Sequence, residues 1–227
     1  MKSIAENLQS ISRQIHGAEQ KYGRPAGSVA LLAVSKTHAA EKVRAAAACG
    51  QRHFGESYLQ EALRKIGDIH DPGLVWHFIG PIQSNKTRGI AENFSWVHSV
   101  DRIKIARRLN DTRPRPLPPL NICIQINISR EATKSGILPE QLTQLAAQIN
   151  ELPRLRLRGL MAMPEATMEV TAQRRAFHAM AELLRQLQAA GYAVDTLSMG
   201  TTQDMEAAIA EGSTMVRIGT ALFGPRE

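Results

Sequence analysis

The feature that most constrains the fold of this chain is an alternation of short apolar runs with helix-like segments along almost its whole length. Runs with the length and composition of strands lie at 28–36, 52–56, 74–80, 94–101, 120–127, 155–163, 194–200 and 213–224. Segments with helical periodicity separate them, at 39–49, 57–67, 84–92, 102–111, 139–151, 167–190 and 203–211. Several runs are rich in Val, Ile and Leu with little alternation, which is typical of strands buried on both faces of a parallel sheet. The pattern predicts successive right-handed β–α–β units.

Eight strands in a chain of 227 residues favour an α/β fold, a single (β/α)8 barrel of the TIM type near the small end of its size range. The main rival is a doubly wound sheet, but its GxGxxG phosphate-binding fingerprint is missing. The proline-rich stretch 113–119 is predicted to join a helix to a strand, because the alternation resumes directly after it. Ile4, Leu8, Ile11 and Ile15 follow helical spacing and predict one extra helix at the N-terminus. We therefore expect residues 1–227 to form one barrel domain.

Composition and charge narrow the classes of partner. The chain has 28 basic and 21 acidic residues, a net charge of +7, which suits nucleic acid, a phosphorylated small molecule or a soluble surface alike. Nucleic-acid binding is not expected, because no RNA-binding motif or interleaved aromatic residues accompany the arginines. Cys49 and Cys123 lack paired spacing, which favours a reduced, cytoplasmic protein. Without a signal peptide or a long apolar run, no membrane association is expected.

Lys36 is the most informative candidate site residue. In (β/α)8 barrels the active site lies at the carboxyl ends of the strands, and Lys36 closes the first apolar run. Partial burial at the mouth of a barrel lowers the pKa of an ammonium group and makes the free amine available for imine formation. A lysine at the end of a strand can equally extend into solvent along its apolar stem. The position alone therefore leaves both interpretations open.

A phosphate-binding signal follows the last two predicted strands. Many barrels of this class bind phosphate with the loops after strands seven and eight. Here these loops contain the segment 198–202, Ser-Met-Gly-Thr-Thr, and the pair Gly219 and Thr220, which combine backbone access with hydroxyl donors. Together with Lys36 they predict a phosphorylated carbonyl compound bound as an imine. An aldolase-type barrel acting on a phosphosugar would satisfy the same features.

One further cation and a set of histidines lie within predicted strands. Arg217 falls inside the last run, and a buried guanidinium requires an acceptor, either a carboxylate or a ligand atom. His53, His77 and His98 lie in or beside strands without HxH, HExxH or cysteine partners. We interpret them as core histidines, and no metal site is expected.

Long sequence blocks across essentially the whole chain resemble one known family. They are AVSKTH around Lys36, FGESYLQEA (54–62), WHFIGPIQSNKTR (76–88), INISREATKSG (126–136), RGLMAMP (158–164), LSMGTTQDMEAAI (197–209) and GSTMVRIGTALFG (212–224). These blocks resemble the YggS/PROSC family, the pyridoxal phosphate homeostasis proteins. The resemblance implies a fold-type III barrel similar to the N-terminal domain of alanine racemase.

The resemblance also implies roles for individual residues. Lys36 matches the lysine that holds pyridoxal 5′-phosphate (PLP) as a Schiff base, and Arg217 matches the arginine that faces the pyridine nitrogen. The phosphate-binding positions of the family match Ser198, Met199, Gly219 and Thr220. One position departs from the family pattern, because FGENY is usual and Ser57 replaces the asparagine here. That departure puts the corresponding contact with the cofactor in question.

The implied role is that of a cofactor-holding protein, with no residue expected to be catalytic. An arginine beside the pyridine nitrogen keeps it unprotonated, which weakens the ring as an electron sink. Alanine racemase also uses a tyrosine from a partner chain that carries a C-terminal β domain, and this sequence ends at Glu227 without one. We therefore expect a cytoplasmic, monomeric protein of vitamin B6 homeostasis, with PLP-dependent apo-enzymes as recipients. The alternative is a small PLP-dependent amino-acid racemase or lyase with Tyr58 or His77 as its second base.

Overall fold

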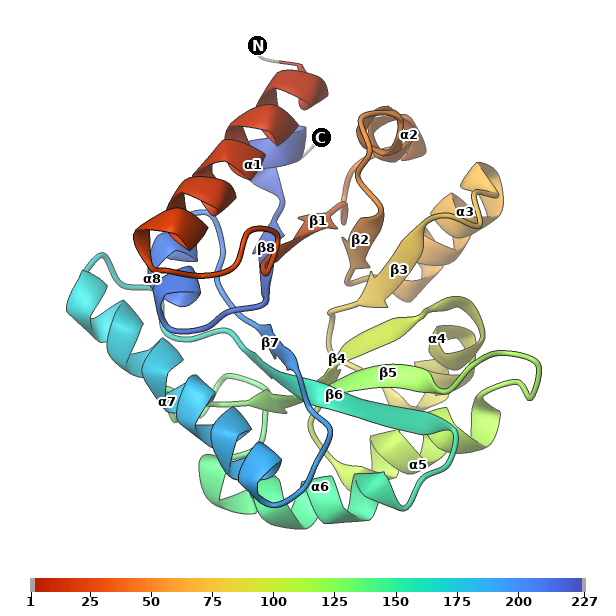
Figure 1. Cartoon of the computed structure of the whole chain (residues 1–227). Helices are drawn as coiled ribbons and strands as arrows, with labels where there is room; N and C mark the ends of the chain where they lie inside the picture. The colour runs from red at the N-terminus through yellow and green to blue at the C-terminus, as the bar shows by residue number, and fades with distance from the viewer. Residues whose placement is uncertain (1–2, 226–227) are drawn as a thin grey trace.

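Eight parallel strands close into a barrel in sequence order, with β8 paired to β1 (Figure 1). The structure is a computed structural model, and it describes residues 3–225. The strands are β1 (Ala30–Val34), β2 (His53–Glu56), β3 (Val75–Phe78), β4 (Trp96–Val100), β5 (Leu120–Ile126), β6 (Leu155–Ala162), β7 (Thr196–Ser198) and β8 (Met215–Ile218). The predicted (β/α)8 architecture is confirmed.

Helices follow the strands and surround the barrel (Figure 1). They are α1 (Ile4–Lys21), α2 (Ala40–Ala48), α3 (Leu59–Ile69), α4 (Thr87–Asn93), α5 (Ile103–Thr112), α6 (Leu142–Asn150), α7 (Val170–Ala189), α8 (Met205–Ala210) and α9 (Thr220–Phe223), with short 3-10 turns at Ser84–Lys86 and Pro139–Gln141. In the part of the chain that the structure describes, none of these helices combines the length and the apolar content needed to cross a membrane.

The predicted N-terminal helix, α1, is present and packs beside the last helices of the chain (Figure 1). Ser3 and Glu6 form a capping box that satisfies the first backbone N–H groups of this helix. The Nδ2 of Asn7 donates a hydrogen bond to the Leu222 carbonyl of α9 at 3.0 Å. The first and last helices of the described chain therefore support one another next to β8.

Alternation along each strand separates two environments. One face of the sheet packs against the helices and forms the main apolar core, with Phe54, Val97 and Leu160 among its fully buried side chains. The other face points into the barrel, where Trp96, Cys123 and Met161 form a small apolar cluster. Polar and charged side chains occupy much of the rest of the barrel interior.

The last predicted strand was too long. The apolar run 213–224 was expected to be one strand, but β8 ends at Ile218 and α9 begins at Thr220. Gly219 separates them and lies so close to β1 that an added Cβ would come within 3.2 Å of the Val34 carbonyl oxygen. A short apolar run does not by itself distinguish a buried strand from a buried helix, which is why the pattern missed this boundary. The proline-rich segment does join α5 to β5, as predicted.

Candidate functional site

A cavity of about 590 Å³ opens at the carboxyl ends of the strands. Its wall is made by segments that follow β1, β3, β6, β7 and β8, which are distant in sequence and meet because parallel strands end at the same rim. The volume lies within the range of about 300–1,000 Å³ that is usual for small-molecule sites. The apolar part of the wall comes from Val34, Ile79, Met163 and Ala221.

Four of the predicted site residues line this cavity. Lys36, two residues beyond β1, is half-buried there, and Arg217 of β8 contributes a second cationic side chain. Gly219 and Thr220 follow directly after β8 on the same wall. The structure therefore brings an amine, a guanidinium and a glycine–hydroxyl pair into one space.

The segment after β7 also reaches the cavity, but through residues later than those singled out in the sequence. Thr201, Thr202 and Gln203 line the cavity, whereas Ser198 and Met199 are fully buried and do not. The N–H of Met199 donates to the Met215 carbonyl oxygen at 3.1 Å. Phosphate binding by Ser198 and Met199 therefore stays a prediction, and the structure adds the three later residues as candidates.

Gly200 explains why the later residues are the ones that reach the cavity. Its φ of 96° is a left-handed conformation that favours glycine, and it turns the chain directly after β7. An added Cβ would lie 2.6 Å from the Cβ of Ala208, so no larger residue fits without movement of α8. The Gly200 carbonyl oxygen accepts a hydrogen bond from the N–H of Arg217 at 2.9 Å, which ties this turn to β8.

Arg217 has its acceptors inside the barrel. Its Nη1 donates to the Ser198 carbonyl oxygen and, at 3.0 Å, to Ser198 Oγ, while Nη2 donates to the Ala162 carbonyl oxygen at 2.8 Å. Burial lowers the pKa of Arg217 to about 10, and the charge of Asp204 opposes this effect. The guanidinium is therefore a cation near neutral pH, and backbone and hydroxyl oxygens hold it rather than a carboxylate.

The three strand histidines form a chain with Ser198 in the barrel interior. His98 Nδ1 lies 2.8 Å from Ser198 Oγ, His77 Nδ1 lies 2.9 Å from His98 Nε2, and His53 Nδ1 lies 3.0 Å from His77 Nε2. Burial lowers the pKa of His77 well below its ordinary value and that of His98 to about 3, so both rings are neutral near pH 7. Among residues 3–225, no three His, Cys, Asp or Glu side chains are placed to hold a metal ion together.

This arrangement bears on the two side chains considered as a second base. Both ring nitrogens of His77 are engaged with other histidines, and the side chain is fully buried. Tyr58 is 56% exposed, at the start of α3, and is not part of the cavity wall. The structure therefore places neither side chain on the cavity wall.

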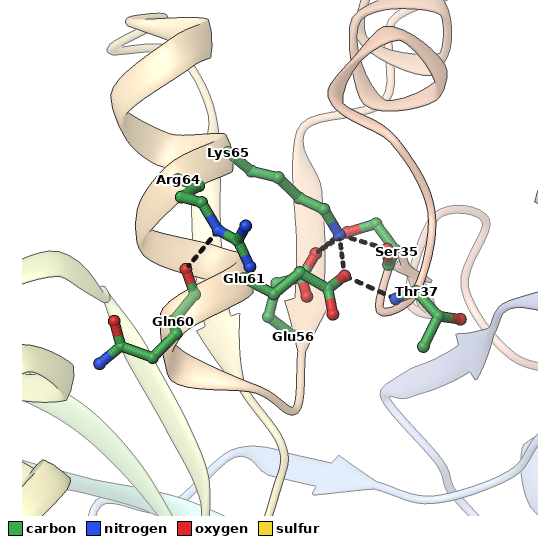
Figure 2. A network of polar contacts seen from close by, with 7 residues as sticks. All are labelled: Ser35, Thr37, Glu56, Gln60, Glu61, Arg64 and Lys65. Carbon is green, nitrogen blue, oxygen red and sulfur yellow. Dashed lines mark hydrogen bonds and ion pairs between the residues drawn. The ribbon is translucent and has the colours of Figure 1, made fainter. Parts of the chain in front are cut away.

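A second polar cluster connects Ser35 and Thr37, the residues on either side of Lys36 in the sequence, to α3 (Figure 2). Lys65 of α3 is buried, and its Nζ donates to the Ser35 carbonyl oxygen at 2.6 Å. The same Nζ contacts Glu56 Oε1 at 2.7 Å and Glu61 Oε1 at 2.5 Å. Ser35 Oγ also donates to Glu56 Oε1, at 2.6 Å. The cluster therefore joins β1, β2 and α3 directly beneath the rim.

This cluster also fixes the residue that follows Lys36. Thr37 has a φ of 63°, which is unusual for a β-branched residue, and its N–H donates to Glu61 Oε1 at 2.6 Å (Figure 2). The neighbours of Lys36 on both sides, Ser35 and Thr37, are thus held by one network. These residues were not predicted from the sequence. The only available signal was the four-residue spacing of Glu61 and Lys65 on one helix face.

Ser57, the position that departs from the family pattern, is half-buried and is not part of the cavity wall. Its backbone packs against Gly80 so closely that a Cβ on Gly80 would lie 2.2 Å from the Ser57 carbonyl oxygen. The segments after β2 and β3 are therefore held together through the backbone of Ser57.

Two arginines, Arg154 and Arg158, have partners within the fold. Arg154 donates through Nη2 to the carbonyl oxygens of Pro114 and Leu117 and so fastens the proline-rich segment. Arg158 pairs with Asp195 at 2.6 Å and lies over the ring of Trp96, 4.8 Å from its centroid. Part of the positive charge therefore serves the fold itself.

Sequence comparisons agree with the geometry. The family model of the alanine racemase N-terminal domain matches residues 3–227. The chain is 59% identical over 227 residues to the pyridoxal phosphate homeostasis protein of Pseudomonas aeruginosa, covering 100% of this chain and 97% of that protein. It is 52% identical over 230 residues to the protein of the same name from Escherichia coli K12, covering 100% of this chain and 98% of that protein.

Solved structures give the same fold. PipY of Synechococcus elongatus, solved with PLP bound, superposes with a TM-score of 0.86 at 36% identity, over 98% of this chain and 100% of that one. Alanine racemase from Corynebacterium glutamicum superposes with a TM-score of 0.73 at 17% identity, over 98% of this chain and 60% of that one. The second similarity is one of fold.

Proposed function

The chain belongs to the family of pyridoxal phosphate homeostasis proteins, built on the alanine racemase N-terminal domain, and from this premise we propose that it binds PLP through Lys36 and serves in the supply of that cofactor. The observation that carries the proposal is the single cavity that joins Lys36, Arg217, Gly219 and Thr220. The PLP-bound relative PipY, of the same fold, supports it.

The residues present fit the chemical groups of PLP. The cofactor has an aldehyde, an aromatic ring and a phosphate, and when bound it supplies a carbonyl that condenses with an amine and a ring that accepts electron density. The cavity offers the Lys36 amine, the Arg217 cation and the apolar side chains of Val34, Ile79 and Met163. It also offers the hydroxyls of three threonines, at positions 201, 202 and 220. Each group of the cofactor thus has a chemically suitable partner.

Within this proposal the residues have distinct roles. Lys36 holds the cofactor covalently through Nζ, and Arg217 faces the pyridine nitrogen. Gly219 and Thr220 bind the phosphate, together with the segment 201–203 after β7. Phosphate binding by Ser198 and Met199 stays part of the proposal, and Ser198 also accepts a hydrogen bond from Arg217.

We propose that the protein holds and transfers the cofactor without robust catalysis. A guanidinium beside the pyridine nitrogen disfavours protonation of that nitrogen, and the unprotonated ring is a weak electron sink. His77 has both ring nitrogens engaged inside the barrel, and Tyr58 lies outside the cavity wall. An amino-acid racemase or lyase would need a second acid–base group at the cavity.

The setting of this activity belongs to the same proposal. We propose that residues 1–227 act as one domain, that the protein is a cytoplasmic monomer, and that PLP-dependent apo-enzymes receive its cofactor. The two cysteines, which are unpaired, suit a reducing compartment. A single cooperative unfolding transition and a monomeric mass in solution are the results expected.

The absorption spectrum of the purified protein tests the proposal. PLP-loaded wild-type protein should be yellow, Lys36→Ala should lose the visible band, and the matched control Lys104→Ala, at an exposed position on α5, should keep it. A visible band that persists unchanged in Lys36→Ala would overturn the role of this lysine.

A transfer assay tests the supply role. Loaded protein mixed with a PLP-dependent apo-enzyme should restore that enzyme's activity and lose its own visible band in parallel. Turnover of amino acids by the loaded protein itself, with no transfer to the apo-enzyme, would instead favour the racemase or lyase reading.

A further inference from the structure

Hydrogen bonds cross the interior of the barrel without interruption, from Arg217 on β8 to His53 on β2. The order is Arg217, Ser198, His98, His77 and His53, with separations of 3.0, 2.8, 2.9 and 3.0 Å between successive polar atoms. Arg217, Ser198, His98 and His77 are buried, with at most 5% of each exposed, and His53 at the far end is half-buried. One end lines the cavity and the other lies at the start of β2.

Arg217, the first residue of the hydrogen-bond chain, sets the direction of hydrogen-bond donation along it. A guanidinium only donates, so Ser198 Oγ accepts from Arg217. Among the described residues, His98 Nδ1 is the one acceptor paired with this hydroxyl, so we assign the hydroxyl hydrogen to that nitrogen. A neutral imidazole that accepts at Nδ1 carries its proton on Nε2, and His98 Nε2–H donates to His77 Nδ1. The same step is repeated from His77 Nε2–H to His53 Nδ1. One arginine thus fixes the tautomers of His98 and His77.

The other charged and titratable groups near Arg217 are few. Asp204, in the segment after β7, and Cys123 on β5 interact with it electrostatically, and Lys36 lines the same cavity. Burial raises the pKa of Cys123 to about 12, so its thiol is uncharged near neutral pH. His98 feels the charges of Arg217 and His53, and stays neutral. The hydrogen-bond chain from Arg217 to His53 therefore holds one positive charge, and that charge is on Arg217.

We propose that Ser198, His98 and His77 are positioning residues of the binding site, which hold Arg217 in one orientation and one charge state toward the cavity. Both Nη1 protons and one Nη2 proton of Arg217 have acceptors inside the barrel. Its Nε–H and its other Nη2–H are the donors that remain for a ligand. The effect on bound PLP rests on the proposed function, whereas the hydrogen-bond chain does not.

Two pairs of variants separate positioning from mere packing. His98→Leu removes both hydrogen-bonding functions of the ring, and His98→Gln restores one acceptor and one donor. Ser198→Ala removes the hydroxyl between Arg217 and His98. Its control, Ser99→Ala, removes an equally buried hydroxyl that donates to the Gly80 carbonyl oxygen outside the chain.

Nitrogen NMR of the histidine rings tests the chain in the protein without PLP. The wild-type protein near pH 7 should show His77 and His98 as neutral Nε2–H tautomers, and Ser198→Ala should make the His98 tautomer mixed while Ser99→Ala leaves it unchanged. The proposed hydrogen-bond chain would be refuted if His77 or His98 in the wild-type protein were charged or carried the proton on Nδ1. It would also be refuted if the two serine variants gave equal spectra.

The pH dependence of the absorption spectrum tests the consequence for bound PLP. A guanidinium that is held less firmly opposes protonation of bound PLP less strongly. The midpoint pH of the change in the absorption spectrum should therefore rise by about one pH unit in His98→Leu and Ser198→Ala. It should stay at the wild-type value in His98→Gln and Ser99→Ala. Equal midpoints for His98→Leu and His98→Gln, with both folded by circular dichroism, would refute the positioning role. If His98→Leu does not fold, the serine pair decides. If the wild-type protein does not bind PLP, the proposed function is refuted, and the NMR test of the hydrogen-bond chain remains valid.

Discussion

Thr37 combines an unfavourable backbone conformation with a place next to the proposed cofactor-binding lysine. Its φ of 63° lies in the left-handed region, and a hydrogen bond from its N–H to Glu61 holds it there. Non-glycine residues in sparsely populated backbone regions cost about 1–3 kcal/mol and persist where the surrounding structure fixes them. The turn that carries Lys36 is therefore kept rigid at some expense in stability.

Replacement of Thr37 by glycine should make the protein more stable. Relief of the left-handed conformation outweighs the extra chain entropy of glycine, about 0.5–1 kcal/mol, so the free energy of unfolding should rise by about 1 kcal/mol. Urea denaturation measures this change. Thr171→Gly, at an exposed position in α7, should instead lower the free energy of unfolding. A loss of stability in Thr37→Gly would show that the backbone there is not strained.

At the scale of single residues, the sequence predicted some of the residues that line the cavity. Lys36, Arg217, Gly219 and Thr220 lie at strand ends, and the rule that active sites lie at the carboxyl ends of barrel strands was enough to select them. The sequence did not indicate that the Ser198 hydroxyl lies 2.8 Å from His98 Nδ1 inside the barrel, and phosphate binding at this position stays a prediction. Which face a residue presents depends on where a three-residue strand begins and ends, and apolar patterning does not define that boundary.

At the scale of elements, α3 is anchored to β1 and β2 by one buried lysine. Lys65 contacts two carboxylates and a backbone carbonyl, and nearly all of its surface is buried (Figure 2). Burial raises the pKa of Glu56, and the charge of Lys65 opposes this effect. Removal of the cation leaves the buried Glu56 carboxylate without its partner and next to the partly exposed Glu61.

Lys65→Met should therefore lower the free energy of unfolding by about 3–5 kcal/mol, the usual cost of leaving a buried charge without its partner. The difference in the free energy of unfolding between Lys65→Met and the wild-type protein should shrink as the pH falls. Without Lys65, the folded-state pKa of Glu56 rises further above its unfolded value, so the variant gains stability as the pH drops from that raised pKa toward the unfolded one. Denaturant titrations at several pH values measure both effects.

The surface variant Lys104→Met provides the matched control and should change stability by less than about 0.5 kcal/mol at every pH. A deficit of Lys65→Met that stays constant with pH would contradict the role of Glu56 in the cluster.

The pairing of β6 with β7 depends on one glycine. An added Cβ at Gly159 would lie 1.9 Å from the Thr196 carbonyl oxygen, and its φ of 156° is one that side chains rarely adopt. Gly159→Ala should therefore lower the free energy of unfolding by more than about 3 kcal/mol, since overpacking and backbone strain act together. Thermal unfolding measures the loss.

Gly67→Ala is the opposite case, because Gly67 is exposed in α3 with nothing within 4 Å of an added Cβ. This variant should be more stable, by up to about 1 kcal/mol, through helix propensity alone. Equal effects of the two alanine variants would mean that strands β6 and β7 do not pack as closely as described.

At the scale of the whole molecule, the fold was predictable and the barrel interior was not. The alternation of apolar runs and helical segments fixes strand number and order, because each strand must be followed by a helix that covers it. The hydrogen-bond chain from His53 to Arg217 joins five strands, β2, β3, β4, β7 and β8, across the interior, and such pairings depend on the stagger of all the strands. The three histidines were predicted to be core residues, but no local pattern indicated that they contact one another.

Two polar networks, the Lys65 cluster and the histidine chain, support residues of the cavity wall. The Lys65 cluster holds the turn of Lys36 from outside the barrel, and the histidine chain holds Arg217 from inside. The cavity lies between these two supports, with Lys36 and Arg217 both on its wall. A lysine amine and a guanidinium that face one cavity suit a protein that holds one anionic cofactor in a defined pose.

The most direct test of the central claim is to locate the covalent bond to the cofactor. Loaded protein is reduced with borohydride, digested and mapped by mass spectrometry, and the visible spectrum is recorded before and after reduction. We expect one modified peptide, with the added mass on Lys36, and no modified peptide from Lys36→Ala. An adduct on a different lysine, or a wild-type protein that carries none, would contradict it.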